Sequence, residues 1–148
     1  MSAPLLHIPT QEEFLSMLRR HELKATRQRL AVHQAMMTLV HASPDMVCEE
    51  LSRSGSAVTP ASVYNILSQL ADYHIYARRQ SVAGKMFFDV CTERHFHLYD
   101  RENHTYRDVL DLDLAAEITS RLKRRKFKGF SVEDIDIQLI ARPTRKKK

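Results

Sequence analysis

Apolar residues in the first half of the chain recur at helical spacing and predict two opening helices. Phe14, Leu15 and Leu18 form a short apolar stripe. The next helix begins after Thr26, whose hydroxyl can accept a bond from the first free N–H groups. The apolar positions of this second helix are Leu30, Met36, Met37, Leu39 and Val40.

Two more helices begin at Ser-Pro and Thr-Pro pairs, because proline is favoured at the first helical position. Ser43-Pro44 starts the third helix, which Gly55 ends, and Thr59-Pro60 starts the fourth. The fourth helix has the cleanest period in the chain. Its stripe is Val63, Ile66, Leu67 and Leu70, spaced i, i+3, i+4 and i+7. Ser62, Tyr64 and Asn65 are left on its polar side.

A β-hairpin follows, with strands over 75–82 and 85–90 joined at Ala83-Gly84. Helices followed by a hairpin that carries Arg78 and Arg79 are typical of a winged helix-turn-helix. That unit places its recognition helix in the DNA major groove. A protein-interaction module fits the same element order, so the pattern alone leaves both functions open.

The second half predicts a small α+β unit. Strands are expected over 95–99 and 104–110, and Leu114, Ile118 and Leu122 mark a helix. Ile135, Ile137 and Leu139 alternate in a last strand. The predicted fold is therefore α+β, with a DNA-binding domain at 1–90, a small α/β dimerisation and metal-sensing domain at 95–141, and a basic tail at 142–148. So thin a core favours a homodimer, and a tetramer is left open.

Composition narrows the class of protein. The chain has 148 residues, 43% of them hydrophobic, and no apolar run long enough to span a membrane. We expect a cytoplasmic protein, since the N-terminus lacks the order of a secretory signal. Two cysteines without a C-x-x-C pair exclude a structural zinc bound by four cysteines, so a metal would rely on histidine and carboxylate ligands. Cys48 is expected to be buried in a helix and Cys91 to be exposed.

The net charge of +5 favours a polyanionic partner. Most of the excess lies in the second half, around 121–128 and 145–148, where a solvated helix end and tail explain it equally well. The better phosphate-contact candidate is the local cluster of Arg19, Arg20, Lys24, Arg27 and Arg29.

An H-x-H pair carries the most specific chemistry. Side chains two apart on a strand share a face, so His95 and His97 project together at a spacing able to hold one metal ion. Alone, the pair also fits two surface or hydrogen-bonded histidines. Asp89, Asp108 and His41 lie where they could complete the ligand set. Imidazole with carboxylate suits Fe(II), Mn(II) or Zn(II), and a site that bridges two domains would sense the metal.

Three motifs in this order resemble the ferric uptake regulator superfamily. They are LKATRQRL at 23–30, ASVYNILSQL at 61–70 and the run FDVCTERHFH at 88–97. The resemblance implies a dimeric winged-helix repressor that binds an A·T-rich inverted repeat of double-stranded DNA under metal control. It places the regulatory metal on His41, Asp89, His95, His97 and Asp108. It also places DNA contacts on Lys24, Arg29, Ser62, Tyr64 and Asn65, beside the hairpin residues Arg78 and Arg79.

Two branches of that superfamily are similar to this chain. Three histidines and two aspartates match the spacing of the peroxide-sensing branch, in which a ligand histidine is oxidised. The missing C-x-x-C pairs and the stretch Glu102-Asn103-His104 resemble the iron response regulators, which respond to haem. In that case His95 and His97, with His104 as an outside candidate, would be the haem ligands.

The sequence thus predicts a metal- or haem-responsive regulator of iron homeostasis genes, mostly a repressor and not an enzyme. Fe(II) or Mn(II) is the expected ion, and zinc could fill the site in purified protein. A metalloenzyme using the same ligands is the alternative from another class. Against this alternative, the sequence shows no evident general acid or base other than the ligands themselves. It also has no nucleophile elbow and no phosphate-binding glycine loop.

Overall fold

The computed structural model describes residues 7–81, 84–92, 95–109, 111–132 and 135–144. The chain divides into two compact units, one spanning 6–92 and the other 93–148 together with 1–5. The first unit has the helices and hairpin of a winged helix-turn-helix, and the second is a small mixed α/β unit, in agreement with the α+β prediction. Some predictions lie outside the described residues. They are the strand positions Val82 and Leu110, the turn position Ala83, and the end of the basic tail at 145–148.

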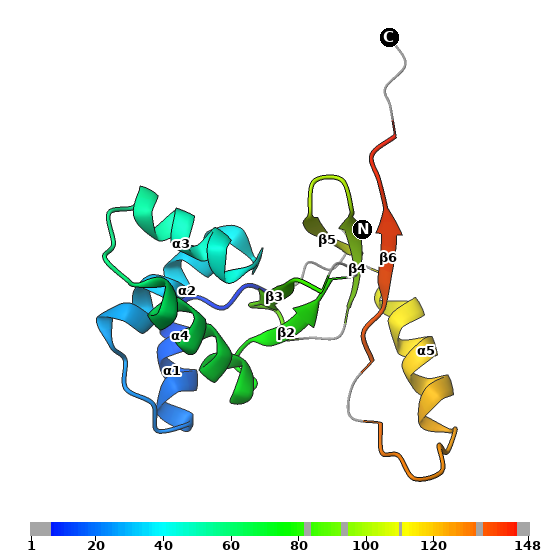
Figure 1. Cartoon of the computed structure of the whole chain (residues 1–148). Coiled ribbons are helices and arrows are strands. Elements are labelled where there is room, and N and C mark those ends of the chain that lie inside the picture. Colours follow the sequence, from blue (N-terminus) through cyan, green and yellow to red (C-terminus); the bar gives the residue numbers. More distant parts are fainter. Residues whose placement is uncertain (1–6, 82–83, 93–94, 110, 133–134, 145–148) are drawn as a thin grey trace, which may run out of the picture. The chain divides into compact units, whose positions relative to one another are not determined.

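Four helices make up most of the first unit (Figure 1). They are α1 (Gln11–Arg20), α2 (Arg27–Leu39), α3 (Pro44–Arg53) and α4 (Pro60–Asp72). Each begins where a hydroxyl side chain accepts a backbone N–H bond in the first turn. The capping residues are Thr10, Thr26, Ser43 and Thr59. The predicted start signals at the second, third and fourth helices are therefore confirmed.

The core of this unit comes from the predicted stripes. Phe14 and Leu18 of α1 are buried, and Val63, Leu67 and Leu70 of α4 are fully so. Ile66 is only partly buried against that cluster. The opposite side of α4 stays open to solvent, which leaves its polar residues free to meet a partner.

A small antiparallel sheet of order β1-β3-β2 completes the unit. The hairpin strands β2 (Ala77–Gln80) and β3 (Met86–Asp89) are shorter than predicted. The third strand, β1 (His41–Ala42), is not among the predicted strands. It forms because the open edge of β3 offers unpaired backbone groups, and the register sets His41 opposite Asp89.

The chain reverses sharply between α2 and β1. Val40 closes the helix with a positive φ of 64°, its N–H bonded to the Met36 carbonyl at 2.7 Å. Its own carbonyl accepts the N–H of Val90 at 3.2 Å. A β-branched residue in this conformation is a strained exception, held in place by bonds on both sides.

A buried histidine makes the stability of this unit sensitive to acid. His33 contacts the Tyr76 hydroxyl at 2.7 Å and the Pro9 carbonyl at 3.0 Å, and its ring stacks on Phe14. Burial lowers the pKa of His33 below its usual value, against the opposing effect of backbone bonds to Pro9 and Thr10.

We expect the free energy of unfolding to fall as the pH drops below about 6.5, the ordinary histidine pKa. The unfolded chain then binds a proton that the folded His33 resists, whereas above this pH its contribution is complete. Urea unfolding of metal-free protein at several pH values measures this, with His33→Gln as the non-titrating comparison. The same pH slope in both proteins would contradict the assignment.

The second unit is a three-stranded sheet with one helix (Figure 1). Its strands are β4 (Phe96–Asp100), β5 (Thr105–Val109) and β6 (Gln138–Ala141), and its helix is α5 (Leu112–Lys123). The sheet order is β5-β4-β6, with β5 antiparallel and β6 parallel to β4. Ile135 and Ile137, predicted within the last strand, precede it. The β4–β5 register pairs His97 with Asp108, so their side chains share one face of the sheet.

Candidate metal centre and nucleic-acid surface

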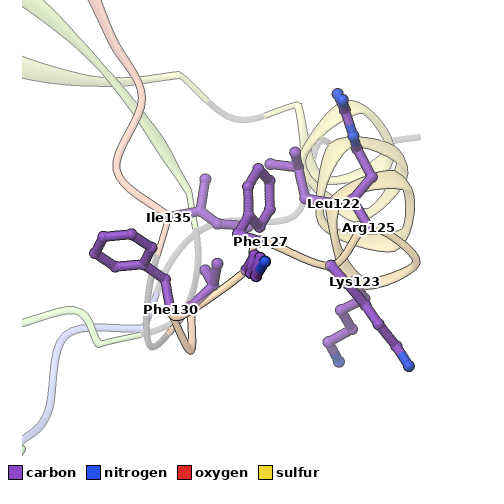
Figure 2. A pocket seen from close by; sticks show the side chains of 9 residues that line it. Leu122, Lys123, Arg125, Phe127, Phe130 and Ile135 are labelled. Atoms are coloured by element: carbon purple, nitrogen blue, oxygen red, sulfur yellow. The ribbon is translucent and has the colours of Figure 1, made fainter.

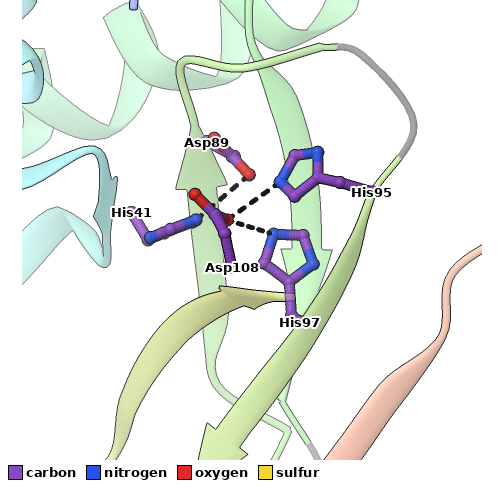
Figure 3. Close-up of side chains that lie close together, drawn as sticks. All are labelled: His41, Asp89, His95, His97 and Asp108. Atoms are coloured by element: carbon purple, nitrogen blue, oxygen red, sulfur yellow. Dashed lines mark ion pairs between the residues drawn. The ribbon is translucent and has the colours of Figure 1, made fainter. Parts of the chain in front are cut away.

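The first unit holds one His–Asp pair on its small sheet. Because His41 and Asp89 are direct partners in the β1–β3 ladder, their side chains share a face. His41 Nε2 lies 3.4 Å from Asp89 Oδ2 (Figure 3). Asp89 is 1% exposed, and its other oxygen accepts the N–H of Cys91 at 2.8 Å. That bond fixes the carboxylate while one oxygen faces the imidazole.

The second unit holds a three-residue cluster. His95 Nε2 and His97 Nε2 lie 3.0 and 3.6 Å from the same oxygen of Asp108 (Figure 3). His97 is fully buried and its ring lies 4.4 Å from that of His95, centroid to centroid. The shared face predicted for the two histidines agrees with this geometry.

Both groups have the chemistry of metal half-sites. Within each group the donor atoms lie within 4.8 Å of one another, and every donor is an imidazole nitrogen or a carboxylate oxygen. Burying a carboxylate is costly unless a positive or hydrogen-bonding partner compensates. The donors suit a borderline divalent ion, because thiolates that would select soft metals are missing from the two groups.

An aromatic residue missed by the sequence analysis supports the second half-site. Tyr106 packs its ring edge-on to His97, with 5.5 Å between centroids. Its hydroxyl donates to Gln138 on β6 at 3.3 Å. Tyr106 and Asp108 are two residues apart on β5, so the strand period could have identified it.

His104 lies apart from these groups. It occupies the turn between β4 and β5 with a φ of 55°, and its Nδ1 lies 2.9 Å from the Tyr99 hydroxyl. Of the three histidines considered for haem, the structure thus brings only His95 and His97 together. Within the described residues, His104 belongs to no group of metal donors.

Both cysteines differ from expectation. Cys91 is 2% exposed, and its thiol donates to the His7 carbonyl at 3.3 Å, so the prediction of an exposed Cys91 was wrong. It is buried because the N-terminal segment at His7 lies against it. Cys48 is partly buried, and desolvation raises the pKa of its thiol, which disfavours the reactive thiolate.

The polar side of α4 presents the predicted DNA-contact residues. Tyr64 is 49% exposed and Asn65 is exposed beside it. Ser62 lies in the first turn, where its hydroxyl accepts a bond from the Thr59 hydroxyl at 2.9 Å. Lys24 is exposed ahead of α2. These residues all belong to the first unit, as a recognition surface requires.

Two of the predicted contact arginines are held by the protein itself. Arg29 donates to the Lys24 carbonyl at 2.7 Å and to Gln69 Oε1 at 2.6 Å. Arg78 donates to Asp72 at 3.1 Å and to the Ser68 carbonyl at 3.2 Å. The acceptors of these bonds lie on α4 or on the segment before α2. The bonds therefore fix the orientation of both guanidinium groups within the protein itself. Arg79 follows on β2 and is half-buried.

Residues 20–140 match the family model of the ferric uptake regulator family. The chain belongs to the ferric uptake regulator family. Regulators of this family bind DNA, are dimeric and are not enzymes, which agrees with the prediction against catalysis. Among curated proteins, no relative matches the chain significantly. In the described parts of the chain, no helix has both the length and the apolar character needed to cross a bilayer.

Several solved structures of the ferric uptake regulator family share the fold. The Pseudomonas aeruginosa ferric uptake regulator with manganese is 22% identical, with a TM-score of 0.69 over 88% of this chain and 98% of that one. The Vibrio cholerae ferric uptake regulator is 20% identical, with a TM-score of 0.71 over 86% and 98%. The Campylobacter jejuni peroxide stress regulator is 25% identical, with a TM-score of 0.66 over 90% and 98%.

Proposed function

We propose that this ferric uptake regulator family protein is a metal-responsive transcription regulator whose two half-sites bind one divalent ion. The observation that carries the proposal is the distribution of donors. The winged-helix unit contributes His41 and Asp89, and the other unit contributes His95, His97 and Asp108. Neither group alone offers the five or six ligands that Fe(II) or Mn(II) commonly takes, whereas together they offer five.

The ion is Fe(II) or Mn(II) in this proposal, with zinc as a competitor in purified protein. Related structures with manganese, with iron and with zinc support this range. When bound, such an ion supplies the positive charge that holds two carboxylates and three imidazoles together. Asp89 and Asp108 would act as anionic ligands, and the three histidines would bind in their neutral form.

Coupling to DNA follows from where the donors lie. Because the half-sites belong to different units, a ligand that needs both favours the arrangement in which they meet. The winged-helix unit, proposed to span 1–90, is thereby oriented relative to the unit at 95–141 and to its dimer partner. The geometry of two recognition helices on an inverted repeat then depends on metal occupancy.

On DNA, we assign base contacts to Tyr64 and Asn65. Tyrosine can pack on a thymine methyl group and asparagine can pair with an adenine edge, which suits an A·T-rich operator. Lys24, Ser62 and Arg79 would contact the backbone, and Arg29 and Arg78 would reach it from their fixed positions. The protein would act in the cytoplasm, mostly as a repressor of iron homeostasis genes.

A haem-responsive mechanism is the second candidate within the same family. The adjacent rings of His95 and His97 favour it, since neutral imidazole is a common ligand of haem iron. This mechanism would make the chain an iron response regulator. A peroxide sensor is the further alternative, supported by the set of three histidines and two aspartates.

Anaerobic fluorescence anisotropy on an inverted-repeat duplex separates the metal-responsive mechanism from the haem-responsive one. We expect Mn(II) or Fe(II) to tighten binding of the metal-free protein by about 5- to 150-fold, the usual range of allosteric coupling. A scrambled duplex of equal length is the control for nonspecific binding. Release of DNA by haemin, with the divalent ions neutral, would favour the haem mechanism. No sequence-specific binding under any condition would contradict the proposal.

A further inference from the structure

The cations of the chain differ in how the protein holds them. At the end of α5, in the unit predicted to form the dimer, Lys123 and Arg125 are exposed (Figure 2). In the winged-helix unit, Arg29 and Arg78 each donate two hydrogen bonds to other residues. An arginine that is already held loses less side-chain freedom when it meets a phosphate. The groups that hold Arg29 and Arg78 therefore bear on DNA binding.

Helix α4 supplies an acceptor to both arginines. Arg29, in the first turn of α2, donates to Gln69 Oε1 at 2.6 Å. Arg78, on β2, donates to Asp72 Oδ1 at 3.1 Å and to the Ser68 carbonyl at 3.2 Å. Gln69 and Asp72 are three residues apart, so they are neighbours on one side of the helix. A single helix thus holds two arginines that come from different elements (Figure 1).

The same helix carries the proposed base contacts. Asn65 precedes Gln69 by four residues, about one turn, so these side chains lie on the same side of α4. Tyr64 is the neighbour of Asn65 and is exposed. Because backbone hydrogen bonds link successive turns of a helix, α4 fixes the spacing between the base contacts and the acceptors of both arginines.

Folding stability does not explain the pair of Asp72 and Arg78. The side chain of Asp72 is 68% exposed and that of Arg78 is 38% exposed, and so exposed an ion pair contributes little to folding. The Arg78 guanidinium carbon also lies 5.8 Å from the centre of the Phe88 ring, which orients it further. A carboxylate beside a phosphate contact repels the DNA backbone. An acidic residue here is therefore unfavourable for DNA binding unless it places Arg78.

We propose that Gln69 and Asp72 are positioning residues for DNA binding. They hold Arg29 and Arg78 at a fixed distance from the base-contacting residues of α4, and they touch no DNA themselves. A guanidinium has more N–H donors than these bonds use, so donors remain for a phosphate oxygen. The proposal rests on the DNA-binding function proposed above and on the backbone contacts assigned there to the two arginines.

Asp72→Ala gives the sharpest test, because the two explanations predict opposite signs. Removing a negative charge near DNA should tighten binding if charge alone matters. If Asp72 positions Arg78, binding should weaken by about threefold or more, and the slope of log K against log salt should become less steep by up to about 0.9. Anisotropy on the inverted-repeat duplex measures both quantities, under the conditions in which the parent protein binds most tightly.

The control variant is Glu49→Ala, which removes the same charge from an exposed position on α3. It should leave the affinity unchanged or raise it. Asp72→Ala should weaken binding to the scrambled duplex as well, because phosphate contacts carry no sequence information. Equal urea unfolding midpoints confirm that both variants are folded. Equal losses in the two variants, or a loss confined to the inverted repeat, would contradict the positioning of a backbone contact.

Double-mutant cycles test whether each residue acts through its arginine. Asp72→Ala should not weaken binding further in an Arg78→Ala background. Gln69→Met removes an acceptor without changing charge, and it should weaken binding by about threefold or more. In an Arg29→Ala background the same change should cost less than about twofold. Additive losses in these cycles would overturn the proposal.

Failure of this proposal is distinguishable from failure of the proposed function. If the parent protein shows no sequence-specific binding, the DNA-binding function is contradicted, and the positioning role with it. If the parent binds specifically and Arg78→Ala weakens binding while Asp72→Ala does not, only the positioning role is wrong. If Arg29→Ala and Arg78→Ala both bind as the parent does, neither arginine contacts a phosphate, and the positioning role is likewise wrong.

Discussion

Replacing His97 with alanine should lower the affinity for Mn(II) by at least about 100-fold and abolish metal-dependent DNA binding. His97 is fully buried and lies 3.6 Å from Asp108, so its imidazole is positioned as a direct ligand. Loss of even an outer partner of a metal site costs about 10- to 100-fold, and a direct ligand should cost more. Calorimetric Mn(II) titration under anaerobic conditions measures the affinity, with anisotropy as the functional readout.

The matched control is His104→Asn in the same unit. Asparagine tolerates the positive φ at this position, and His104 lies outside the donor groups, so the affinity for Mn(II) should stay within about twofold. Since removing His97 creates a cavity, Asp108→Asn provides a nearly isosteric second variant that should also lose affinity. Retention of metal binding by both His97→Ala and Asp108→Asn would rule out this half-site.

The variant His41→Gln tests whether the two units bind one ion together. If they do, this change on β1 should weaken Mn(II) binding together with the changes on β4 and β5, and should remove the DNA response. If the affinity is unchanged while His97→Ala abolishes binding, the ion belongs to the second unit alone, and the coupling mechanism proposed above is wrong.

The second large effect concerns α4, whose two sides should respond oppositely to substitution. Leu67→Ala should lower the free energy of unfolding by about 2–5 kcal/mol, because Leu67 is fully buried and its loss leaves a cavity. Tyr64→Ala, on the exposed side three residues earlier, should change it by less than about 0.5 kcal/mol. Urea unfolding of the metal-free proteins measures both values.

For DNA affinity, measured on folded protein, Tyr64→Ala should have the larger effect and Leu67→Ala the smaller one. Tyr64→Ala should weaken binding to the inverted repeat by about tenfold while leaving the scrambled duplex unaffected, as expected for a base contact. Leu67→Ala, measured at a temperature where it remains folded, should bind nearly as the parent does. If Tyr64→Ala reduces affinity for both duplexes equally, Tyr64 does not read bases.

Helix starts were predictable from sequence because their cause is local. Thr26, Ser43 and Thr59 each cap a helix through a bond to an N–H three residues on. The period of α4 likewise identified Leu67 as buried and Tyr64 as exposed. Such features depend on a few neighbouring residues, so a single sequence contains them.

Features that depend on distant pairing were harder to predict. The strand at His41 exists only because β3 passes beside it, and nothing within a two-residue segment indicates strand. The burial of Cys91 likewise depends on a distant segment, since its thiol contacts the N-terminal segment at His7. The last strand was predicted to start too early because Ile135 and Ile137 alternate as Leu139 does. The strand that pairs with β4 spans Gln138–Ala141.

Val40 places backbone strain immediately before His41, the first of the proposed metal ligands. A conformation of this kind costs about 1–3 kcal/mol and persists because Met36 and Val90 bond the residue on both sides. The reversal it creates sets the imidazole of His41 toward β3 before any ion arrives. If His41 is a metal ligand as proposed, less order would have to be imposed on it when the ion binds, and part of the affinity for metal would be established when the winged-helix unit folds.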